Sequence, residues 1–151
     1  MPDIAIIYAS VHHGNTRKLL EGAVTESGID LINADKAGNT DFSKYKAVGF
    51  ASGIYMSNFH KSLQKFLNDS PHLPQKTFII YTSGSGSKKY ADAFAKRLNA
   101  LGLKVLGIYQ CKGYDTYGPF KIIGGIAKGH PNMKDIKKCA DFLKNKVQSQ
   151  L

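Results

Sequence analysis

The sequence predicts a single α/β domain of three layers, in which helices cover both faces of a doubly wound parallel sheet. Short apolar runs typical of buried strands alternate with segments of helical periodicity along all 151 residues. The runs are continuous rather than alternating, as expected for strands that are buried on both faces. They predict five strands, at residues 4–9, 29–33, 47–51, 77–82 and 103–110.

Four segments carry apolar residues at helical spacing. Their apolar faces are Leu19, Leu20, Ala23 and Val24; Phe59, Leu63, Phe66 and Leu67; Ala91, Phe94, Ala95, Leu98 and Leu101; and Ile136, Cys139, Ala140, Leu143 and Val147. Gly28 and Gly102 follow two of these helices, where a left-handed cap favours glycine. Residues 34–46 have poor helix propensity, so we expect a loop or one short turn there. Residues 111–132 form a long, glycine-rich connection, which is usually functional or mobile in a compact domain.

The net charge of +10 is unevenly distributed. Residues 1–75 are neutral, whereas residues 76–151 hold fourteen Lys/Arg against four Asp and so carry the whole excess. Basic proteins often bind nucleic acid or acidic partners. These lysines are scattered over predicted helices, however, and no nucleic-acid motif accompanies them. We therefore interpret them as solvated helix faces and expect no nucleic-acid partner.

The chain starts with Met1-Pro2-Asp3 and then enters a strand, without the basic segment and cleavage site of a signal peptide. No apolar run approaches the roughly 20 residues that span a membrane. We therefore expect a cytoplasmic monomer that does not insert into a membrane.

The two cysteines, Cys111 and Cys139, are far apart in sequence, and buried free thiols are favoured over a disulfide.

The loop after the first strand has the composition of a phosphate-binding turn. It contains Ser10, Val11, His12, His13, Gly14, Asn15 and Thr16, and a helical pattern follows directly. A helix N-terminus has free backbone N–H groups and a positive dipole end, and both attract an anion. Hydroxyls can add donors, while glycine and asparagine tolerate the dihedral angles of a tight turn. An ordinary strand-to-helix loop with an Asn or Thr cap is the alternative.

Two further loops are expected at the same edge of the sheet. One follows the third strand and contains Ser52, Gly53, Ile54, Tyr55, Met56, Ser57 and Asn58; the other follows the fourth and contains Thr82, Ser83, Gly84, Ser85, Gly86 and Ser87. Ligands of open parallel sheets bind beyond the carboxyl ends of the strands, where strand order reverses. Small residues let backbone approach a flat ligand, and Tyr55 and Met56 offer apolar, polarisable contacts to a ring system.

Other kinds of site are not supported by the sequence. The segment Gly84-Ser85-Gly86 lacks the third glycine of a dinucleotide-binding fingerprint, and no Walker-type loop is present. The five histidines do not have the spacing of metal ligands. Ser83 and Ser85 have no evident His and Asp partners for nucleophilic chemistry, and Asp115 has no second carboxylate near it. We therefore predict no metal ion and no catalytic side chain.

The loop from Ser10 to Thr16, SVHHGNT, resembles the phosphate loop of the flavodoxin family, and the order of the three loops matches over essentially the whole chain. The resemblance implies strand order 2-1-3-4-5 and non-covalent FMN. It implies that residues 10–16 hold the phosphate and that residues 52–58 and 82–87 flank the isoalloxazine, with Tyr55 or Met56 stacked on it. Tyr114 and Tyr117 would border its exposed edge. The chain departs from the family in having no Trp, two histidines in the phosphate loop and a strongly basic charge.

The expected function is one-electron transfer between partner proteins through an exposed flavin edge, at low potential. The basic charge implies partners with acidic docking surfaces and a potential less extreme than that of acidic flavodoxins. Two alternatives remain. One is an FMN-dependent oxidoreductase of the protoporphyrinogen oxidase or quinone reductase type, since the stretch from Ile54 to Lys61 resembles flavodoxin-type protoporphyrinogen oxidases. The other is a basic binding module without flavin. If His12 and His13 contact the phosphate, FMN affinity should rise as pH falls through the histidine range.

Overall fold

The computed structural model describes residues 2–10, 14–25, 28–69, 71–114 and 127–151. Its centre is a sheet of five parallel strands in the order β2-β1-β3-β5-β6. The strands are β1 (Ile4–Ala9), β2 (Asp30–Asn33), β3 (Ala47–Tyr55), β5 (Lys76–Ser83) and β6 (Lys104–Lys112). A two-residue strand, β4 (Asn58–Phe59), pairs antiparallel with β3. Counting only the five parallel strands, the order is the predicted 2-1-3-4-5, so the predicted fold class is confirmed.

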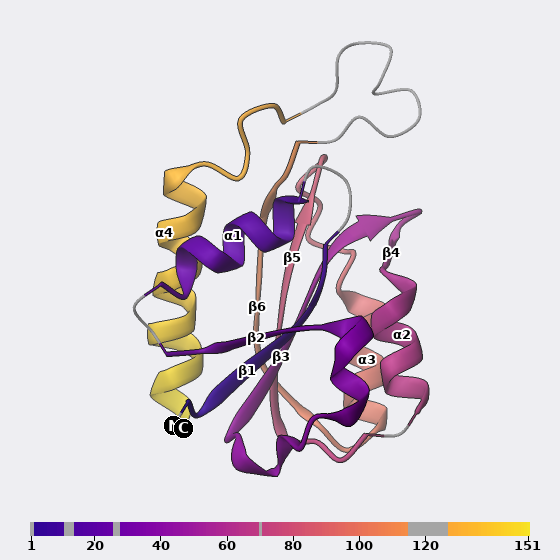
Figure 1. Ribbon diagram of the computed structural model, residues 1–151. Helices are drawn as coiled ribbons and strands as arrows, with labels where there is room; N and C mark the ends of the chain where they lie inside the picture. Colours follow the sequence, from indigo (N-terminus) through magenta and orange to yellow (C-terminus); the bar gives the residue numbers. More distant parts are fainter. Residues whose placement is uncertain (1, 11–13, 26–27, 70, 115–126) are drawn as a thin grey trace.

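Helices cover both faces of the sheet (Figure 1). One face carries α1 (Asn15–Ala23) and α4 (Met133–Phe142), and the other carries α2 (Lys61–Asn68) and α3 (Asp92–Ala100). Beyond α4, the chain continues through a π-helical turn at Leu143–Val147 and a 3-10 turn at Gln148–Gln150. No helix in the described part of the chain is long and apolar enough to cross a membrane.

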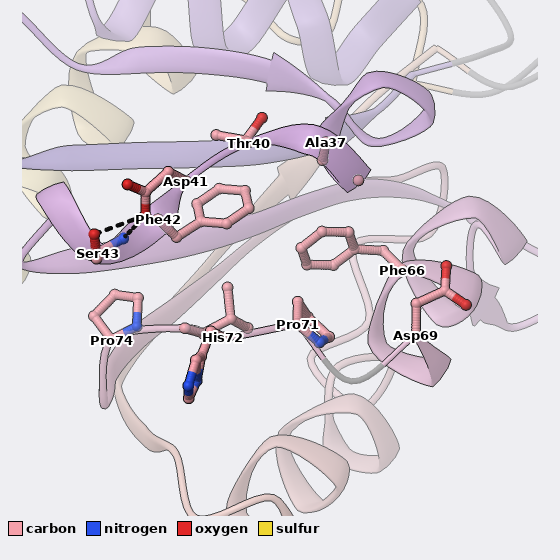
Figure 2. Close-up of a pocket in the computed structure, with 12 residues that line it drawn as sticks. Ala37, Thr40, Asp41, Phe42, Ser43, Phe66, Asp69, Pro71, His72 and Pro74 are labelled. Atoms are coloured by element: carbon pink, nitrogen blue, oxygen red, sulfur yellow. Dashed lines mark hydrogen bonds between the residues drawn. The ribbon is translucent and has the colours of Figure 1, made fainter.

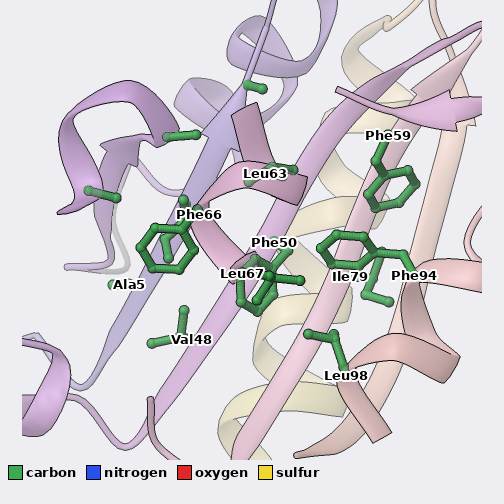
Figure 3. Packing of buried hydrophobic residues seen from close by; sticks show 14 of the residues in the cluster. Ala5, Val48, Phe50, Phe59, Leu63, Phe66, Leu67, Ile79, Phe94 and Leu98 are labelled. Atoms are coloured by element: carbon green, nitrogen blue, oxygen red, sulfur yellow. The ribbon is translucent and has the colours of Figure 1, made fainter. Parts of the chain in front are cut away.

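The core consists of one apolar cluster on each side of the sheet. Beneath α2 and α3, Phe50 packs edge-on against Phe94 with ring centroids 5.5 Å apart, and Phe59 stacks on Phe94 at 4.8 Å (Figure 3). On the opposite side, Phe78 lies so close to Gly49 that a Cβ there would be 2.3 Å from the ring. Large aromatic side chains therefore fix the central strands against both helical layers.

The structure differs from the sequence predictions on both sides of the third strand. β3 continues to Tyr55, so Ser52–Tyr55 are strand residues rather than a loop. Phe59 belongs to β4 and not to the helix that follows, because Ile54 pairs with Phe59 across a two-residue turn. Residues 34–46 contain two 3-10 turns, Ala34–Asn39 and Phe42–Lys44, where a loop or one short turn was expected. Asn33 and Asp41 side chains cap these turns.

The prediction that Gly102 caps a helix is confirmed, because Gly102 follows Leu101, the C-cap of α3, with a φ angle of 82°. Gly28 also has a positive φ angle, 68°, but it lies beyond Val24, the C-cap of α1, and so does not cap that helix. Cys111 and Cys139 are buried free thiols, and burial raises the pKa of both, that of Cys111 to about 12. Of the long connection after β6, residues 115–126 lie outside the described residues.

Candidate functional site

Two of the three predicted loops, the first and the third, are joined to each other and to the connection after β6 at the carboxyl edge of the sheet. The Thr16 hydroxyl in the first turn of α1 lies 3.1 Å from the Thr82 hydroxyl at the end of β5. The Asn15 side-chain amide donates a 2.8 Å hydrogen bond to the Tyr114 carbonyl, beyond β6. The Gly113 N–H donates to the Ser83 carbonyl at 2.9 Å. The first loop, the third loop and the start of the long connection therefore form one connected surface.

The first turn of α1 has the features of an anion-binding helix N-terminus. Its N-cap, Gly14, has φ 64° and makes no side-chain cap, and the first turn contains no acidic residue. A Cβ built on Gly14 would meet no atom of the described residues within 4 Å. The Ser10 hydroxyl accepts the Arg17 N–H at 3.1 Å, which supports the turn from inside the helix start. Among the described residues, the first turn of α1 therefore places no carboxylate at the positive end of the helix dipole, and none of their atoms fills the space beside Gly14.

Side chains of the first loop have different roles from those expected. The bonds of Asn15 and Thr16 to Tyr114 and Thr82 direct both side chains toward other loops, and Thr16 is 1% exposed. What these residues offer to a ligand is their backbone. Val11, His12 and His13, also predicted at this site, lie outside the described residues.

The second loop is a β-hairpin with a strained turn. Met56 and Ser57, the two residues between Tyr55 and Asn58, have φ angles of 50° and 65°. Two positive φ angles make this a type I′ turn, which normally contains Asn or Gly. For other residues the left-handed conformation costs about 1 kcal/mol or more each. The turn leaves Met56 79% exposed at the sheet edge.

A hydrogen-bond network connects this hairpin to α2. The Ser52 hydroxyl is fully buried; it donates to the Gly53 carbonyl at 2.6 Å and accepts the His60 N–H at 3.0 Å. Nδ1 of His60 accepts the Ser62 N–H at 3.1 Å and thereby caps α2. The Tyr55 ring meets the His60 ring edge-on, with centroids 5.0 Å apart. Ser52 thus positions the hairpin, and its hydroxyl forms these hydrogen bonds within the protein rather than to a ligand.

His60 was missed as part of this site. Its Nδ1 accepts a backbone N–H, so that nitrogen carries no proton and the neutral ring bears its proton on Nε2. Sequence offers little signal for this role, because Ser, Thr, Asp and Asn are the usual helix caps. The one hint is the change from strand to helix between Phe59 and Leu63.

The third loop is built from successive hydroxyl turns. The Ser83 hydroxyl accepts the Gly86 N–H at 3.0 Å, and the Ser85 hydroxyl accepts the Ser87 N–H at 3.3 Å. The buried Tyr81 hydroxyl donates to the Ser87 carbonyl at 2.6 Å, and burial raises the pKa of Tyr81 to about 12. Ser85 is exposed, whereas Gly84 is buried. Buried residues of β5 therefore hold the loop through hydrogen bonds, and residues 85–87 lie on its outer side.

Two cavities lie near the helices on the α2 side. A cavity of about 670 Å³ adjoins the hairpin and is lined by Tyr55, Met56, Asn58, Phe59, His60, Lys61 and Gln64. A second, of about 480 Å³, lies between the 3-10 turns and the connection after α2 (Figure 2). Its carboxylate Asp41 accepts bonds from the Ser43 N–H and hydroxyl, which lowers the pKa of Asp41. None of the three loops lines the second cavity, so only the first adjoins the candidate site.

In the described ranges, no three His, Cys, Asp or Glu side chains are gathered in a way that could hold a metal ion. What the site offers instead is backbone N–H groups, hydroxyls and the exposed face of a hairpin. Such a surface can bind an anionic group at one end and a flat apolar group at the other.

Comparison with known proteins gives matches over most of the chain. The family model of the flavodoxin domain matches residues 5–117. An uncharacterized protein of Methanocaldococcus jannaschii is 40% identical over 142 residues, which cover 93% of this chain and 95% of that protein.

Solved structures share the fold at low sequence identity. Oxidised flavodoxin 2 of Bacillus cereus has a TM-score of 0.69 and 16% identity, covering 97% of this chain and 99% of that one. A flavoprotein of Lactobacillus acidophilus, solved in complex with FMN, has a TM-score of 0.58 and 16% identity, covering 73% of this chain and 93% of that one.

Proposed function

The chain belongs to the flavodoxin-domain family, and on that premise we propose that it binds one FMN at the carboxyl edge of its sheet and carries electrons between partner proteins. The observation that carries the proposal is the joining of the first loop, the third loop and the start of the long connection around the N-terminus of α1. The Lactobacillus acidophilus flavoprotein with this fold was solved with FMN, which supports the same cofactor here.

The N-terminus of α1 fits the phosphate of FMN. Backbone N–H groups of the first turn would bind it, and Gly14 leaves room for its approach. The absence of an acidic residue from this turn avoids repulsion of a dianion. Asn15 and Thr16 hold the turn in place through their bonds to Tyr114 and Thr82. His12 and His13 remain proposed contributors of positive charge at low pH.

The hairpin and the third loop fit the ring system. Met56 and Tyr55 would cover one side of it, and residues 85–87 would line the other with backbone and small side chains. Tyr114 would border its edge, next to Asn15. Bound flavin supplies one- and two-electron redox chemistry, while this chain orients it, shields one side from water and sets the surrounding charge. No side chain needs to move a proton in this role.

The absorption spectrum tests cofactor binding directly. The purified protein should show a resolved flavin spectrum near one equivalent, either as isolated or after FMN is added and the excess removed. A colourless protein that cannot be reconstituted would contradict the proposal and favour a basic binding module. Reduction of a partner protein by the flavin-loaded chain, at rates that fall with salt, tests the carrier role.

A second candidate is an FMN-dependent oxidoreductase acting on a small molecule. The observation that favours it is the 670 Å³ cavity beside Tyr55, Met56 and His60, which is large enough for a ring-containing substrate. Steady-state reduction of a quinone without a partner protein would establish this activity. Turnover that requires a protein acceptor would leave the carrier role as the better proposal.

A further inference from the structure

A groove of about 510 Å³ is lined mainly by residues of β6, the last strand of the sheet, together with Tyr81 of β5. Ile108 and Gln110 pair with Ile79 and Tyr81, which belong to the core beneath α2 and α3. Cys111, which also lines the groove, belongs to the opposite core, beneath α1 and α4. Successive residues of a strand point to opposite faces. A single cavity lined from both faces must therefore wrap around the edge of the strand.

This edge is open in the described part of the chain, where β5 is the strand that pairs with β6. Ile108 is 44% exposed there. An open edge presents backbone N–H and C=O groups that can pair with another extended segment. The Gln110 side chain adds a buried oxygen, Oε1, that has no hydrogen-bond partner among the described residues. A buried acceptor of this kind is satisfied by an incoming N–H donor.

The groove is positively charged on both sides. Lys88 and Lys138 line it, and Lys112 stands at the end of the strand. Within the described ranges none of these three lysines forms an ion pair. The carboxylate in the groove, Asp135, is already bonded to His130 Nδ1 at 2.7 Å and to the Asn132 N–H at 2.8 Å. The charge therefore favours an acidic occupant and disfavours a second copy of the same edge.

We propose that this groove binds an extended acidic segment of a partner protein, which adds to β6 as a further strand. Main-chain hydrogen bonds would supply affinity, and neighbouring acidic side chains, pointing to opposite faces, would reach Lys88 and Lys138. The proposal rests on the proposed function in one respect. Lys88 follows the third loop directly, so the segment would hold a redox partner beside the flavin edge.

The test uses the FMN-loaded protein and a fluorescein-labelled peptide of sequence Thr-Val-Glu-Glu-Val-Thr. The peptide should bind, and binding should slow amide hydrogen exchange within residues 104–112. The double variant Lys88→Glu/Lys138→Glu should weaken binding by about tenfold or more. The control Lys36→Glu/Lys65→Glu makes the same change in net charge at exposed positions away from the groove, and should bind like the parent. A peptide with Pro in place of both Val residues lacks the N–H groups for strand pairing and should not bind.

Equal binding by both double variants, or slowed exchange elsewhere than β6, would overturn the proposal. So would a dimer in sedimentation that Lys88→Glu/Lys138→Glu alters, because the occupant would then be a second copy. If the protein binds FMN but not the peptide, the proposed role of the groove is overturned and the proposed function is not. A protein that binds the peptide but no flavin supports the groove and overturns the proposed function.

Discussion

The N-terminus of α1 and the β3–β4 hairpin lie at the same edge of the sheet but are built in opposite ways. At α1 a glycine, Gly14, takes the left-handed conformation, and the side chains of Asn15 and Thr16 are bonded to other loops. At the hairpin two non-glycine residues take that conformation, and Met56 is exposed. The first region presents backbone and the second presents a side chain. The difference suits an anion at α1 and an apolar ring at the hairpin.

The largest effect should come from closing the space at α1. Gly14→Ala places a methyl group beside the helix N-terminus and strains the backbone by about 1 kcal/mol. We expect FMN affinity to fall by about 100-fold, equivalent to roughly 2.7 kcal/mol, because the phosphate loses its approach to the first turn. Fluorescence titration of FMN, whose emission changes on binding, measures the loss.

Gly28→Ala is the matched control for this prediction. Gly28 also has a positive φ, 68°, and a Cβ there would also meet no atom of the described residues within 4 Å. It should lose similar stability in urea but keep the parent's FMN affinity. If both variants lose affinity equally, the effect at α1 is only backbone strain.

The next largest effect should be on the midpoint potential of bound FMN, which depends on the positive charge beside the third loop. The Lys112 side chain packs over Gly86, with Cε 3.2 Å from where a Gly86 Cβ would lie. A unit charge at about 10 Å in an effective dielectric of about 20 is equivalent to about 1.7 kcal/mol, or roughly 70 mV, before screening by salt. Lys112→Gln should therefore lower the midpoint potential of bound FMN by tens of millivolts in a spectroelectrochemical titration.

Lys104→Gln is the control, since Lys104 stands at the other end of β6. It should leave the potential nearly unchanged. Equal shifts in both variants would mean that net charge, and not the local position of Lys112, sets the potential.

The contrast between the two regions also explains what the sequence predicts well. Continuous apolar runs and the loops after them predict five parallel strands and one shared edge, because burial on both faces and chain direction decide these features. The hairpin is different. Phe59 precedes Leu63 by four residues and so imitates a helix face, although tertiary pairing with Ile54 places it in β4. No local signal predicts positive φ at Met56 and Ser57, because neither is a residue that favours it.

The hydrogen-bond partners of Asn15 and Thr16 at the carboxyl edge of the sheet could not be predicted from the sequence either. Thr16 and Asn15 look like phosphate donors in the sequence, yet their partners are Thr82 and Tyr114, far along the chain. Such contacts depend on how the loops meet in three dimensions. Sequence identifies the residues that gather at the site, and only the structure separates those that can contact a ligand from those that hold the loops together.

Loosening the third loop should have a smaller effect. Tyr81→Phe removes the hydroxyl that donates to the Ser87 carbonyl, at a cost of about 1 kcal/mol in unfolding free energy and a few-fold loss of FMN affinity. Because the folded pKa of Tyr81 is raised to about 12, its protonated form stabilises the fold below about pH 10. That contribution is lost as pH rises toward the folded value. Urea unfolding from pH 9 to 12 should show a shallower decline for the variant.

Tyr45→Phe is the control for the third loop. Burial likewise raises the pKa of Tyr45 to about 12, and its hydroxyl donates to Asp30 at 2.5 Å, away from the loop. It should reproduce the change in pH dependence while leaving FMN affinity intact. A loss of affinity in both variants would show that general stability, and not the loop, controls binding.

The smallest effect should come from relieving strain in the hairpin. Ser57→Gly allows the observed φ of 65° without a side chain, so the folded state should gain up to about 1 kcal/mol, partly offset by the greater entropy of glycine in the unfolded chain. FMN affinity should stay within a factor of about two, because Met56 keeps its position. Met56→Gly relieves the same kind of strain but also removes the exposed side chain, so affinity should fall while stability rises. If the two variants bind FMN equally well, Met56 does not contact the ring, and the hairpin matters for its backbone just as α1 does.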